Sequence, residues 1–365
     1  MISPKKTCKI ALIGFRLSGG GAEKVMANLS VFFHSKNIEV HTITVLDEVS
    51  YTYSGELLNL GLLKDEKNGF LNKFKRMYVL KKYLNQHNFD FIIDLRPRTK
   101  TLQEIIIARF IYKAKTILTI HSFLIDYYMP KSVWLSKLIY DKCYATITVG
   151  DEIKELVESK YGLKNVTTIH NPIYLEEVEV KCKESFSIDY KYIIAIGQYE
   201  DSIKQFDKLI CSYANSILSK KKIHLVILGN GNKEILETVA KNNDVFEFVH
   251  LMGFQENPYK YLKKALFLVL SSANEGFSNV ILESLACHTP VIAFDCKVGP
   301  SEMIFHRNNG LLVENQNTEK LTEAMNLFVE DELLYLFCKE NAFESVKRFS
   351  LENIGNLWLS LMKIS

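Results

Sequence analysis

Short runs of Ile, Val and Leu alternate with longer amphipathic stretches along most of this 365-residue chain. In the longer stretches the apolar residues recur every three or four positions, which indicates helices. The short runs are apolar at every position, so strands built from them would be buried on both faces. Such strands separated by helices are typical of a parallel, doubly wound α/β sheet. Because the alternation occurs in both halves, the sequence predicts two such sheets.

The predicted elements follow these patterns. In the first half, strands are expected at 9–15, 39–45, 89–94, 115–121 and 145–150, and helices at 22–35, 69–87, 101–113, 131–142 and 150–160. In the second half, strands are expected at 192–197, 223–229, 246–253, 267–272 and 290–295, and helices at 203–218, 231–241, 258–265, 278–288 and 300–305. Three more helices are expected near 318–329, 331–348 and 351–364.

The predicted domain boundary lies near Pro172 and the charged stretch 175–184, which the pattern predicts to be a solvated linker. The expected domains are residues 1–173 and 174–348, each a doubly wound α/β domain. The last helix, within 349–365, is expected to pack back on the first domain.

Composition narrows the class of protein. A net charge of +3 excludes a strongly basic nucleic-acid binder. The seven cysteines are dispersed and form no C-x-x-C pair, which indicates reduced thiols and neither a disulfide framework nor a zinc site. The histidines show no metal spacing, so no metal site is expected. No apolar run approaches the ~20 residues of a membrane span. A cytoplasmic protein is expected, bound at most to the inner face of the membrane.

Two glutamates stand out in the stretch 271–296. Glu275 lies in a small polar loop after a buried strand, and Glu283 lies among apolar residues of the next helix, for which Ser278 is the candidate N-cap. A carboxylate in apolar surroundings needs hydrogen-bond donors, and adjacent sugar hydroxyls can supply them. We therefore expect Glu283 to hold a ribose, the helix start a diphosphate, and Glu275 a second sugar. The alternative is that Glu283 is exposed and Glu275 merely polar.

Three further loops could carry chemistry. Gly20 and Gly21 end a strand-to-helix turn, where glycines allow an anion to approach backbone N–H groups; an ordinary tight turn is equally compatible. Lys204 begins a helix after a strand and could reach a phosphate, although most lysines are simply solvated. His121 ends a very apolar strand, where a structural histidine is the main alternative to a site residue.

These segments together resemble retaining glycosyltransferases of the GT-B fold, specifically the large family four. The resemblance is carried by NEGFSNVILESLACHTPVIAFD, SGGGAEKVMANLS, TIHNPI, IKQFDKLI, LGNGN, VHLMGFQENPYKYLKKA, GPSEMI and NNGLLV. Their order and spacing cover residues 9 to about 313. Each motif is weak alone, but the set is specific. The resemblance implies two doubly wound domains facing a cleft: an acceptor-side Rossmann-like domain at 1–173 and a nucleotide-sugar-binding Rossmann-like domain at 174–348.

By position, the resemblance implies the following roles. Glu283 would bind the donor ribose, Glu275 would contact the transferred hexose, and the backbone of Gly276, Phe277, Ser278 and Asn279 would bind sugar hydroxyls. Lys204, beside Gly197 and Gln198, would neutralise the diphosphate, and Gly20 and Gly21 would lie by the phosphates. The loop of Phe254 would hold the base, and His121 would lie beside the transferred sugar. Gln198 is a departure, because the family usually has arginine there. Either Lys204 carries more of the diphosphate charge or Arg16 supplies it.

The resemblance also implies a mechanism. The sequence has no D-x-D triplet, which fits a metal-independent enzyme without a cofactor. The donor is expected to be a nucleotide sugar, by family habit a UDP-sugar. Retention of configuration is implied, and front-side attack by the acceptor fits the lack of an evident nucleophile. Stabilising the leaving diphosphate is then the main electrostatic task.

The acceptor side is expected in the first domain. Residues 68–84 form a basic amphipathic helix of the kind that lies on anionic lipid, and the loop 94–100 adds cations at a strand end. The expected lipid-side residues are Lys73, Lys75, Arg76, Arg96 and Arg98. The hypothesis is a polyprenyl-diphosphate-linked saccharide acceptor in cell-surface polysaccharide synthesis. The alternative is a helix packed on its sheet with a solvated basic face.

Two other functions share this architecture. One is a nucleotide-sugar epimerase, which would convert the donor without an acceptor. The other is a catalytically silent nucleotide-sugar-binding protein, which the substitution at Gln198 keeps open. The glutamate pair and the lysine segment favour transfer of a hexose or an N-acetylhexosamine.

Overall fold

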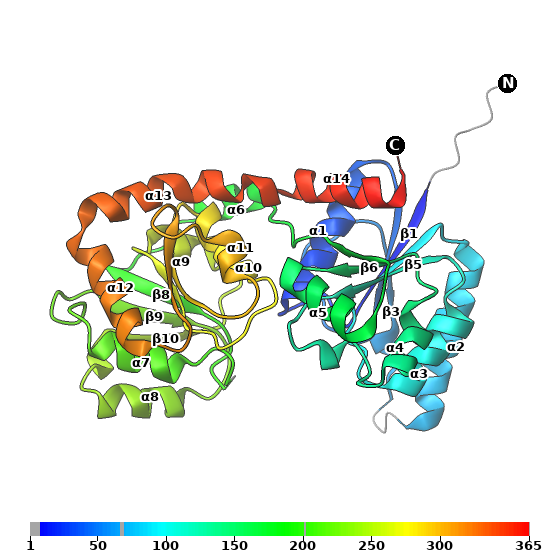
Figure 1. Ribbon diagram of the computed structural model, residues 1–365, viewed down its shortest axis with the longest axis horizontal. Coiled ribbons are helices and arrows are strands. Elements are labelled where there is room, and N and C mark those ends of the chain that lie inside the picture. The colour runs from blue at the N-terminus through cyan, green and yellow to red at the C-terminus, as the bar shows by residue number, and fades with distance from the viewer. Residues whose placement is uncertain (1–7, 66–68, 201, 365) are drawn as a thin grey trace. The chain divides into compact units, whose positions relative to one another are not determined.

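The computed structural model describes residues 8–65, 69–200 and 202–364. The chain divides into two compact units: the first is Met1–Pro172 with Leu351–Ser365, and the second is Ile173–Ser350. Each unit contains one parallel sheet between layers of helices (Figure 1). Asn68, the first residue of the basic stretch singled out in the sequence, lies outside the described residues.

The described residues of the first unit form a sheet of seven strands. In chain order its elements are β1 (Lys9–Gly14), α1 (Gly21–Ser35), β2 (Glu39–Thr44), β3 (Glu56–Asn59), η1 (Leu60–Leu63), α2 (Phe70–His87), β4 (Phe91–Asp94), α3 (Thr101–Ile106), the π-helix η2 (Ile107–Ile111), β5 (Lys115–Ile120), η3 (Ile125–Tyr127), α4 (Val133–Tyr140), β6 (Ala145–Thr148), α5 (Asp151–Tyr161), β7 (Val166–Thr168) and α14 (Leu351–Met362).

In the second unit, the part of the chain that the structure describes forms a sheet of six strands. Its elements are α6 (Leu175–Cys182), β8 (Tyr192–Ile196), α7 (Phe206–Ala214), β9 (His224–Leu228), α8 (Lys233–Asn242), η4 (Phe246–Phe248), β10 (Val249–Gly253), α9 (Tyr259–Lys264), β11 (Leu268–Leu270), α10 (Asn279–Ala286), β12 (Val291–Asp295), α11 (Pro300–Met303), β13 (Gly310–Glu314), α12 (Thr318–Glu330), α13 (Glu332–Val346) and η5 (Lys347–Phe349).

Both sheets are doubly wound, as predicted. The strand orders are β3-β2-β1-β4-β5-β6-β7 and β10-β9-β8-β11-β12-β13, and all pairings are parallel. The chain reverses its direction of winding between β1 and β4 in one sheet, and between β8 and β11 in the other. Ligands of open α/β sheets bind at the carboxyl ends of the strands beside such a reversal. The topology therefore directs attention to the loops after these four strands.

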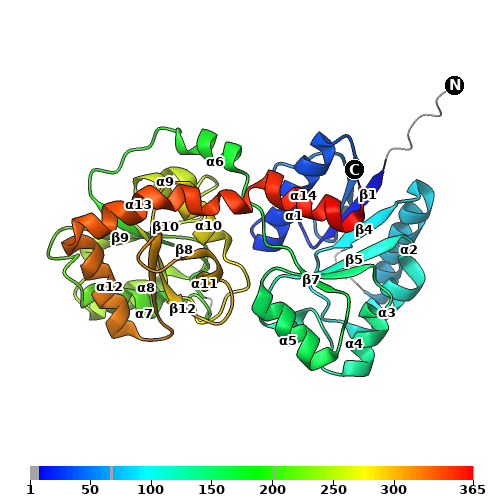
Figure 2. The same cartoon turned by 45° about the horizontal axis from the view of Figure 1, so that its top comes forward.

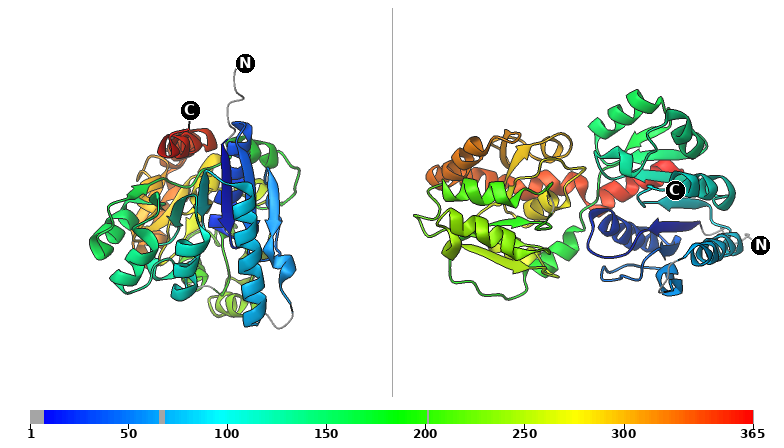
Figure 3. Two further views of the ribbon diagram at one scale, coloured as in Figure 1. Left: turned by 90° about the vertical axis from the view of Figure 1, so that its right-hand side faces the viewer. Right: turned by 90° about the horizontal axis from the view of Figure 1, so that it is seen from below.

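Helices cover both faces of each sheet. In the first unit, α1 packs on β1 and β2, and α14 lies along α1 (Figure 2). The opposite face packs against α2 and η2 through a core that includes Ile13, Ile92 and Leu80. In the second unit, α7, α8 and α12 share one face, where Leu209, Leu236 and other buried side chains pack on the strands. Figure 3 shows the same layers from two more sides.

The charged stretch 175–184 is a correction to the sequence prediction. It contains the helix α6 instead of an irregular linker. Leu175, Val178 and Cys182 recur at helical spacing, and Val178 is 1% exposed. The charged residues lie on the other side of α6 and form i,i+4 ion pairs, such as Lys181 Nζ with Glu177 Oε1 at 2.7 Å. The abundance of charge concealed this short apolar stripe.

Candidate functional site

An ion pair joins the two loops at the reversal point of the second unit. Lys204, in the loop after β8, places its Nζ 2.8 Å from Oε1 of Glu275, in the loop after β11. The side chains are 19% and 10% exposed, so both charges are largely shielded from bulk solvent. Two more bonds connect the loops: Ser271 Oγ donates to Lys204 O at 2.7 Å, and Ala273 N donates to Ile203 O at 2.7 Å. Sequence analysis expected both charged residues here but did not anticipate their pairing.

Glycines allow the backbone to approach this pair closely. A Cβ at Gly197 would lie 2.9 Å from Cγ of Lys204, so the lysine stem crosses the end of β8 only because residue 197 has no side chain. Gly299 has a φ of +103°, and a Cβ there would lie 3.0 Å from the carbonyl oxygen of Gly276. The Lys204–Glu275 pair thus lies in a compact arrangement of three loops.

The segment from Gly276 to Asn279 leads into α10. Phe277 is 5% exposed and packs edge-on against Phe349, with ring centroids 5.3 Å apart, so its side chain is part of the core. Ser278 occupies the N-cap position, yet its side chain makes no capping bond, and its buried Oγ has no hydrogen-bond partner among the described residues. The predicted capping role of Ser278 is therefore wrong. Backbone groups are what this segment can offer a ligand.

Glu283 lies one turn into α10 and is partly buried, as expected. The hydroxyl of Tyr259, in α9, donates to its Oε1 at 3.5 Å. This tyrosine is 3% exposed, so it supports the carboxylate from below while the carboxylate keeps some exposure. Tyr259 was not singled out in the sequence, because its spacing from Glu283 carries no recognisable signal.

The remaining residues predicted for this side lie on neighbouring loops. Gln198 is exposed directly after Gly197. Phe254 is 57% exposed and follows β10, which is separated from β8 by β9. The loop of Phe254 is therefore two strands away from the loop of Lys204. This separation is compatible with Phe254 contacting a different part of a long ligand.

The glycine loop of the first unit follows β1 at the other reversal point. Gly20 is the N-cap of α1, and a Cβ there would overlap the carboxylate of Glu23. Burial is the main cause that raises the pKa of Glu23, whereas its own backbone hydrogen bond and Arg16 act in the opposite direction. Arg16 pairs with Glu48 at 2.7 Å. Glu23 was not predicted from the sequence, although an acidic residue three positions after an N-cap is a known helix-start pattern.

His121 follows β5 with its polar atoms inside the first unit. Both ring nitrogens are buried and have no hydrogen-bond partner of ordinary geometry among the described residues. Burial, then the charge of Arg98, lowers the pKa of His121 to about 3, with the Asn171 side chain opposing the shift. The imidazole is therefore neutral at physiological pH and can act only as a neutral hydrogen-bonding group.

The placement of Arg98 corrects a sequence prediction. Arg98 was expected at a strand end, available to a lipid diphosphate, but it is 2% exposed. Its Nε donates to the Tyr140 hydroxyl at 2.9 Å, and its other nitrogens donate to backbone carbonyls, including that of Thr119. A guanidinium held by so many acceptors stays inside, because exposing it would leave those acceptors unpaired.

Arg96 is likewise buried, at 6% exposure, instead of projecting into solvent. It forms ion pairs with Asp94 at 2.7 Å and Glu104 at 3.0 Å. Burial opposes the charge, but Asp94 and Glu104 raise the pKa of Arg96. Sequence analysis could not detect this network, because Glu104 lies within a stretch that was assigned only a helical pattern.

Three predicted cationic residues nevertheless line one pocket of about 230 Å³ beside the strand ends of the first unit. They are Lys73 and Arg76, from α2, and Arg96. Arg76 is 9% exposed and donates to the carbonyl of Val45, so it does not belong to the exposed face expected for it. The other lining residues are Phe15, Val45, Leu46, Leu60, Lys64, Met77, Leu80, Pro97, Thr99, Lys100, Gln103, Glu104 and Ile107. The pocket thus combines an apolar wall with five cations and one carboxylate.

The exposed face of α2 carries a different set of residues. Its first half exposes Phe70, Leu71, Phe74 and Tyr78 at 51–84%, and Lys75, Lys81 and Lys82 are exposed along the same helix. In contrast, Leu80 and Leu84 are buried in the core. Both sequence interpretations of this helix therefore describe part of it: one side packs on the sheet, and the other exposes apolar and basic residues together.

One group of side chains could hold a metal ion, at the amino end of β2. Donor atoms of Glu39, His41 and His87 all lie within 4.8 Å of one another. Sequence analysis assigned these histidines no role, because His41 and His87 are far apart in the chain. Lys9 already pairs with Glu39 at 2.7 Å, and Tyr83 contacts His41 Nδ1 at 2.6 Å. Glu39 and His41 thus already have polar partners within the protein.

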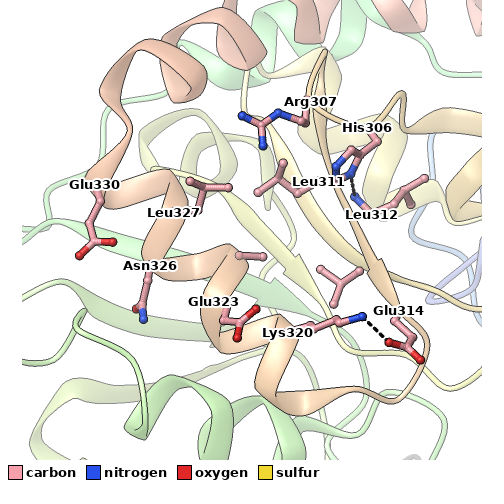
Figure 4. A pocket seen from close by; sticks show the side chains of 12 residues that line it. His306, Arg307, Leu311, Leu312, Glu314, Lys320, Glu323, Asn326, Leu327 and Glu330 are labelled. Carbon is pink, nitrogen blue, oxygen red and sulfur yellow. Dashed lines mark hydrogen bonds and ion pairs between the residues drawn. The ribbon is translucent and has the colours of Figure 1, made fainter.

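A larger pocket, about 590 Å³, lies along the edge strand β13 and α12 (Figure 4). His306 and Leu327 line it, and the Lys320–Glu314 ion pair, at 2.6 Å, borders it. None of the predicted site residues lines this pocket. Because it lies away from the reversal point between β8 and β11, topology assigns the ligand site to the ion pair and not to this larger hollow.

Comparison with known proteins identifies the family. A model of "Glycosyltransferase Family 4" matches residues 19–177, and one of "Glycosyl transferases group 1" matches residues 190–331. N-acetylgalactosamine-N,N'-diacetylbacillosaminyl-diphospho-undecaprenol 4-alpha-N-acetylgalactosaminyltransferase of Campylobacter jejuni is 30% identical over 364 residues, which cover 95% of this chain and 97% of that enzyme. The chain belongs to the family-four glycosyltransferases. The predicted resemblance and enzyme class are confirmed.

Two further similarities agree with this family-four glycosyltransferase. N,N'-diacetylbacillosaminyl-diphospho-undecaprenol alpha-1,3-N-acetylgalactosaminyltransferase, also of C. jejuni, is 26% identical and covers 96% of this chain and 97% of itself. The structure of Staphylococcus aureus TarM with fondaparinux, alpha-GlcNAc-glycerol and UDP superposes with a TM-score of 0.78 at 15% identity, covering 98% of this chain and all of that one (100%). The predicted GT-B fold is confirmed. Among the described residues of this glycosyltransferase, no helix is long and apolar enough to span a membrane.

Proposed function

We propose that this glycosyltransferase moves a hexose or an N-acetylhexosamine from a UDP-sugar, with retention of configuration, to a saccharide linked to a polyprenyl diphosphate. The Lys204–Glu275 pair at the reversal point of the second unit is the observation that carries the donor assignment. TarM, a structural neighbour, was solved with UDP. The names of both Campylobacter relatives specify a diphospho-undecaprenol-linked sugar.

In this proposal each part of the donor binds a different residue of the second unit. Glu283, supported by Tyr259, accepts hydrogen bonds from the ribose hydroxyls. Lys204 moves from Glu275 to the diphosphate, where a full negative charge replaces the carboxylate as its partner. Glu275, once released, accepts hydrogen bonds from the transferred sugar. The ion pair thus keeps Lys204 at the reversal point before the donor arrives, and it must break when the diphosphate binds.

The chemistry follows from charge. The leaving group is a nucleoside diphosphate, and negative charge grows on its terminal phosphate as the glycosidic bond breaks. Lys204 stabilises this charge, and N–H groups at the start of α10 add the positive end of the helix dipole. Since Gln198 contributes no charge, Lys204 carries most of this task on its side. The neutral imidazole of His121 is suited to hydrogen-bond a sugar hydroxyl without adding a cation.

The pocket between α2 and the strand ends of the first unit is the proposed site for the acceptor's diphosphate. Lys64, Lys73 and Lys100 offer ammonium groups for its charge, while Leu60, Met77 and other apolar side chains suit the first isoprene units. The exposed aromatic and basic face of α2 would then lie against the membrane that holds the lipid. The acceptor and the membrane surface are proposed together, because such a lipid is membrane-bound.

Calorimetry with UDP tests the donor site. Replacing Lys204 with Ala should weaken UDP binding by about tenfold or more, since a hydrogen bond to a charged group contributes ~1.5–3 kcal/mol. Lys208→Ala is the matched control: Lys208 lies on α7 nearby and bonds Gln316 instead of either site glutamate. Equal UDP affinity in the two variants would refute the assignment of Lys204.

A panel of nucleotide sugars, screened by thermal shift, identifies the donor. The sugar that stabilises most is then incubated with the enzyme alone and with a short polyprenyl-diphosphate saccharide. Transfer requires the acceptor, whereas conversion of the donor alone would indicate an epimerase.

A further inference from the structure

Two cysteines from different helices lie in contact in the second unit. Cys182 is the last residue of α6, and Cys287 follows the last residue of α10. Their sulfur atoms are 3.3 Å apart. The positions are 105 residues apart in the chain, so the sequence gives no hint of the pair. Figures 1 and 2 show α6, α9 and α10 gathered on one side of this sheet.

The two thiols have unequal surroundings. Cys182 is partly exposed, whereas Cys287 is 1% exposed. The thiol of Cys287 lowers the pKa of Cys182 by hydrogen bonding, burial opposes this, and Lys263 lowers it further. Burial, followed by the contact with Cys182, raises the pKa of Cys287. One accessible thiol that ionises easily beside a buried thiol is the arrangement found at redox-active cysteine pairs.

Both sulfurs also contact the same backbone group. Each lies 3.7 Å from the carbonyl oxygen of Tyr259. The hydroxyl of this tyrosine donates to Glu283 at 3.5 Å, and Glu283 lies in α10, four residues before Cys287, which caps the end of that helix. The thiol pair is thus connected to a proposed donor-binding carboxylate in two ways: through Tyr259 and along α10.

We propose that Cys182 and Cys287 form a redox-modification site that is oxidised by hydroperoxides to an intramolecular disulfide. The Cys182 thiolate attacks a peroxide oxygen, which breaks the O–O bond, forms a sulfenic acid and releases hydroxide. The Cys287 thiol loses its proton to that hydroxide, giving water. Its sulfur then attacks the sulfenic sulfur, and the displaced hydroxide leaves as a second water after taking up a proton from solvent. Overall, two thiols and one hydrogen peroxide give one disulfide and two waters.

The required movement is small. A disulfide has an S–S distance of about 2.05 Å, so the sulfurs must approach by roughly 1.2 Å from their present 3.3 Å. Cys182 is at the end of α6, and Cys287 lies just beyond the end of α10, where side chains and backbone adjust most easily. By contrast, burial raises the pKa of Cys296 to about 12 and that of Cys338 to about 11, so these two thiols react slowly.

Oxidation would also alter the donor site, a consequence that rests on the proposed function. The disulfide removes both S–H groups from the Tyr259 carbonyl and ties the end of α10 to α6. Because Tyr259 and α10 position Glu283, the affinity for UDP should fall in the oxidised protein. A fall of about fivefold is the lower end of typical coupling between two sites.

The test compares reduced protein with protein treated with stoichiometric hydrogen peroxide. Peptide mass spectrometry should find Cys182 linked to Cys287, with the loss of two hydrogens and full reversal by dithiothreitol. Cys182→Ser should abolish the crosslink, while Cys211→Ser, which changes another partly buried cysteine of the same unit, should retain it. Sulfinic acid at Cys182 without a crosslink, or a crosslink to a different cysteine, would overturn the proposal.

Two measurements keep the test decisive. Phenylarsine oxide, which bridges adjacent thiols, should bind the wild type with 1:1 stoichiometry. It should not bind Cys182→Ser in this way, because that variant lacks one thiol of the pair. This binding tests the pair even if a change at buried Cys287 unfolds the protein. UDP calorimetry is done in parallel on the reduced and oxidised protein. If the disulfide forms and the affinity for UDP does not change, the predicted effect of oxidation on the donor site is refuted. If the reduced protein does not bind UDP, the donor assignment fails, while the mass measurement still decides on the disulfide.

Discussion

At the residue scale, Glu275 has two competing partners. In the structure it holds Lys204 at 2.8 Å, and in the proposed reaction it releases this lysine to the diphosphate. A largely buried ion pair is sensitive to the loss of one partner, because the remaining charge is left uncompensated. Glu275 therefore keeps the ammonium group of Lys204 at the site and at the same time competes with the donor diphosphate for it.

This leads to a prediction with opposite effects on binding and catalysis. Glu275→Gln should bind UDP several-fold more tightly, because the ammonium of Lys204 loses its competing carboxylate, yet transfer should be slower. Calorimetry and an assay of the same preparation measure the two effects. Asp207→Asn, an exposed acidic residue near the start of α7, serves as the control and should change neither. Weaker UDP binding by Glu275→Gln would contradict the competition.

A second prediction concerns pH. Burial lowers the pKa of His121 from 6.5 to about 3, so the unfolded chain binds a proton that the folded protein refuses. The free energy of unfolding should therefore fall as pH drops below about 6.5, by ~2 kcal/mol at pH 5. His121→Gln should remove this part of the pH dependence. Urea denaturation at pH 5 and 7.5 measures it.

The exposed histidine His34 provides the control, since replacing it with Gln should leave the acid sensitivity in place. Both tryptophans, Trp134 and Trp358, lie in the first unit with His121, so their fluorescence follows the correct part of the chain. An unchanged pH profile in His121→Gln would show that the imidazole is hydrated.

At the element scale, α2 serves two purposes that its sequence mixes. Leu80 and Leu84 fasten it to the sheet, and Lys73 and Arg76 turn towards the pocket. The opposite face remains apolar at its start and basic near its end. If this face lies against the membrane as proposed, it should bind anionic bilayers through both insertion and charge.

Vesicle co-sedimentation tests this face. Lys81→Glu combined with Lys82→Glu should strongly reduce binding to anionic vesicles at low salt, because each cation near such a surface contributes ~1 kcal/mol. The same change at Lys220 and Lys221, exposed residues of the second unit, gives an equal change in net charge and should have little effect. Equal losses in the two variants would attribute binding to net charge alone.

The strands and helices also show how much of the secondary structure could be predicted from the sequence. Most strands and helices of both sheets were predictable, because a buried parallel strand is apolar throughout and its neighbouring helices are amphipathic. The short edge strands β3, β7 and β13 were not predicted, since an edge strand needs fewer apolar residues. The predicted strand 246–253 begins with η4, and the predicted helix 101–113 contains a π-helical turn. Hydrophobic periodicity alone cannot distinguish a short 3-10 helix from the start of a strand, or a π-helical turn from an α-helical one.

The candidate site was predictable in its residues but less so in its contacts. Lys204, Glu275 and Glu283 were singled out from their positions and the family resemblance; the structure brings the first two together and places Glu283 in α10, and their roles stay predictions. Arg98 was misplaced, because a cation at a strand end looks the same in sequence whether it faces solvent or the interior. Tyr259 could not be found at all, since its contact with Glu283 depends on how α9 packs beside α10.

At the scale of the whole molecule, the chain passes from the first unit to the second after Pro172 and returns after Ser350. The returning helix α14 packs on α1, where Gly355 lies against the ring of Phe32 and has no room for a Cβ. Trp358, 2% exposed, is buried on the same helix. The first unit is thus completed by residues that follow the entire second unit.

Enlarging this glycine tests the attachment of α14. Gly355→Leu should lower the free energy of unfolding of the first unit by about 1–3 kcal/mol, the usual effect of overpacking. The emission of Trp358 should shift to the red as the helix loosens. Leu357→Ala, at a half-exposed position of the same helix, is the control and should change neither stability nor emission. An unaltered unfolding midpoint in Gly355→Leu would mean that α14 is not tightly attached.

The late arrival of α14 has a consequence during synthesis. As the nascent chain leaves the ribosome, residues 173–350 are available to fold before residues 351–362 emerge. Until then, the surface of α1 around Phe32 stays uncovered, although everything else in the amino-terminal portion has already been made. The portion translated first is therefore finished last.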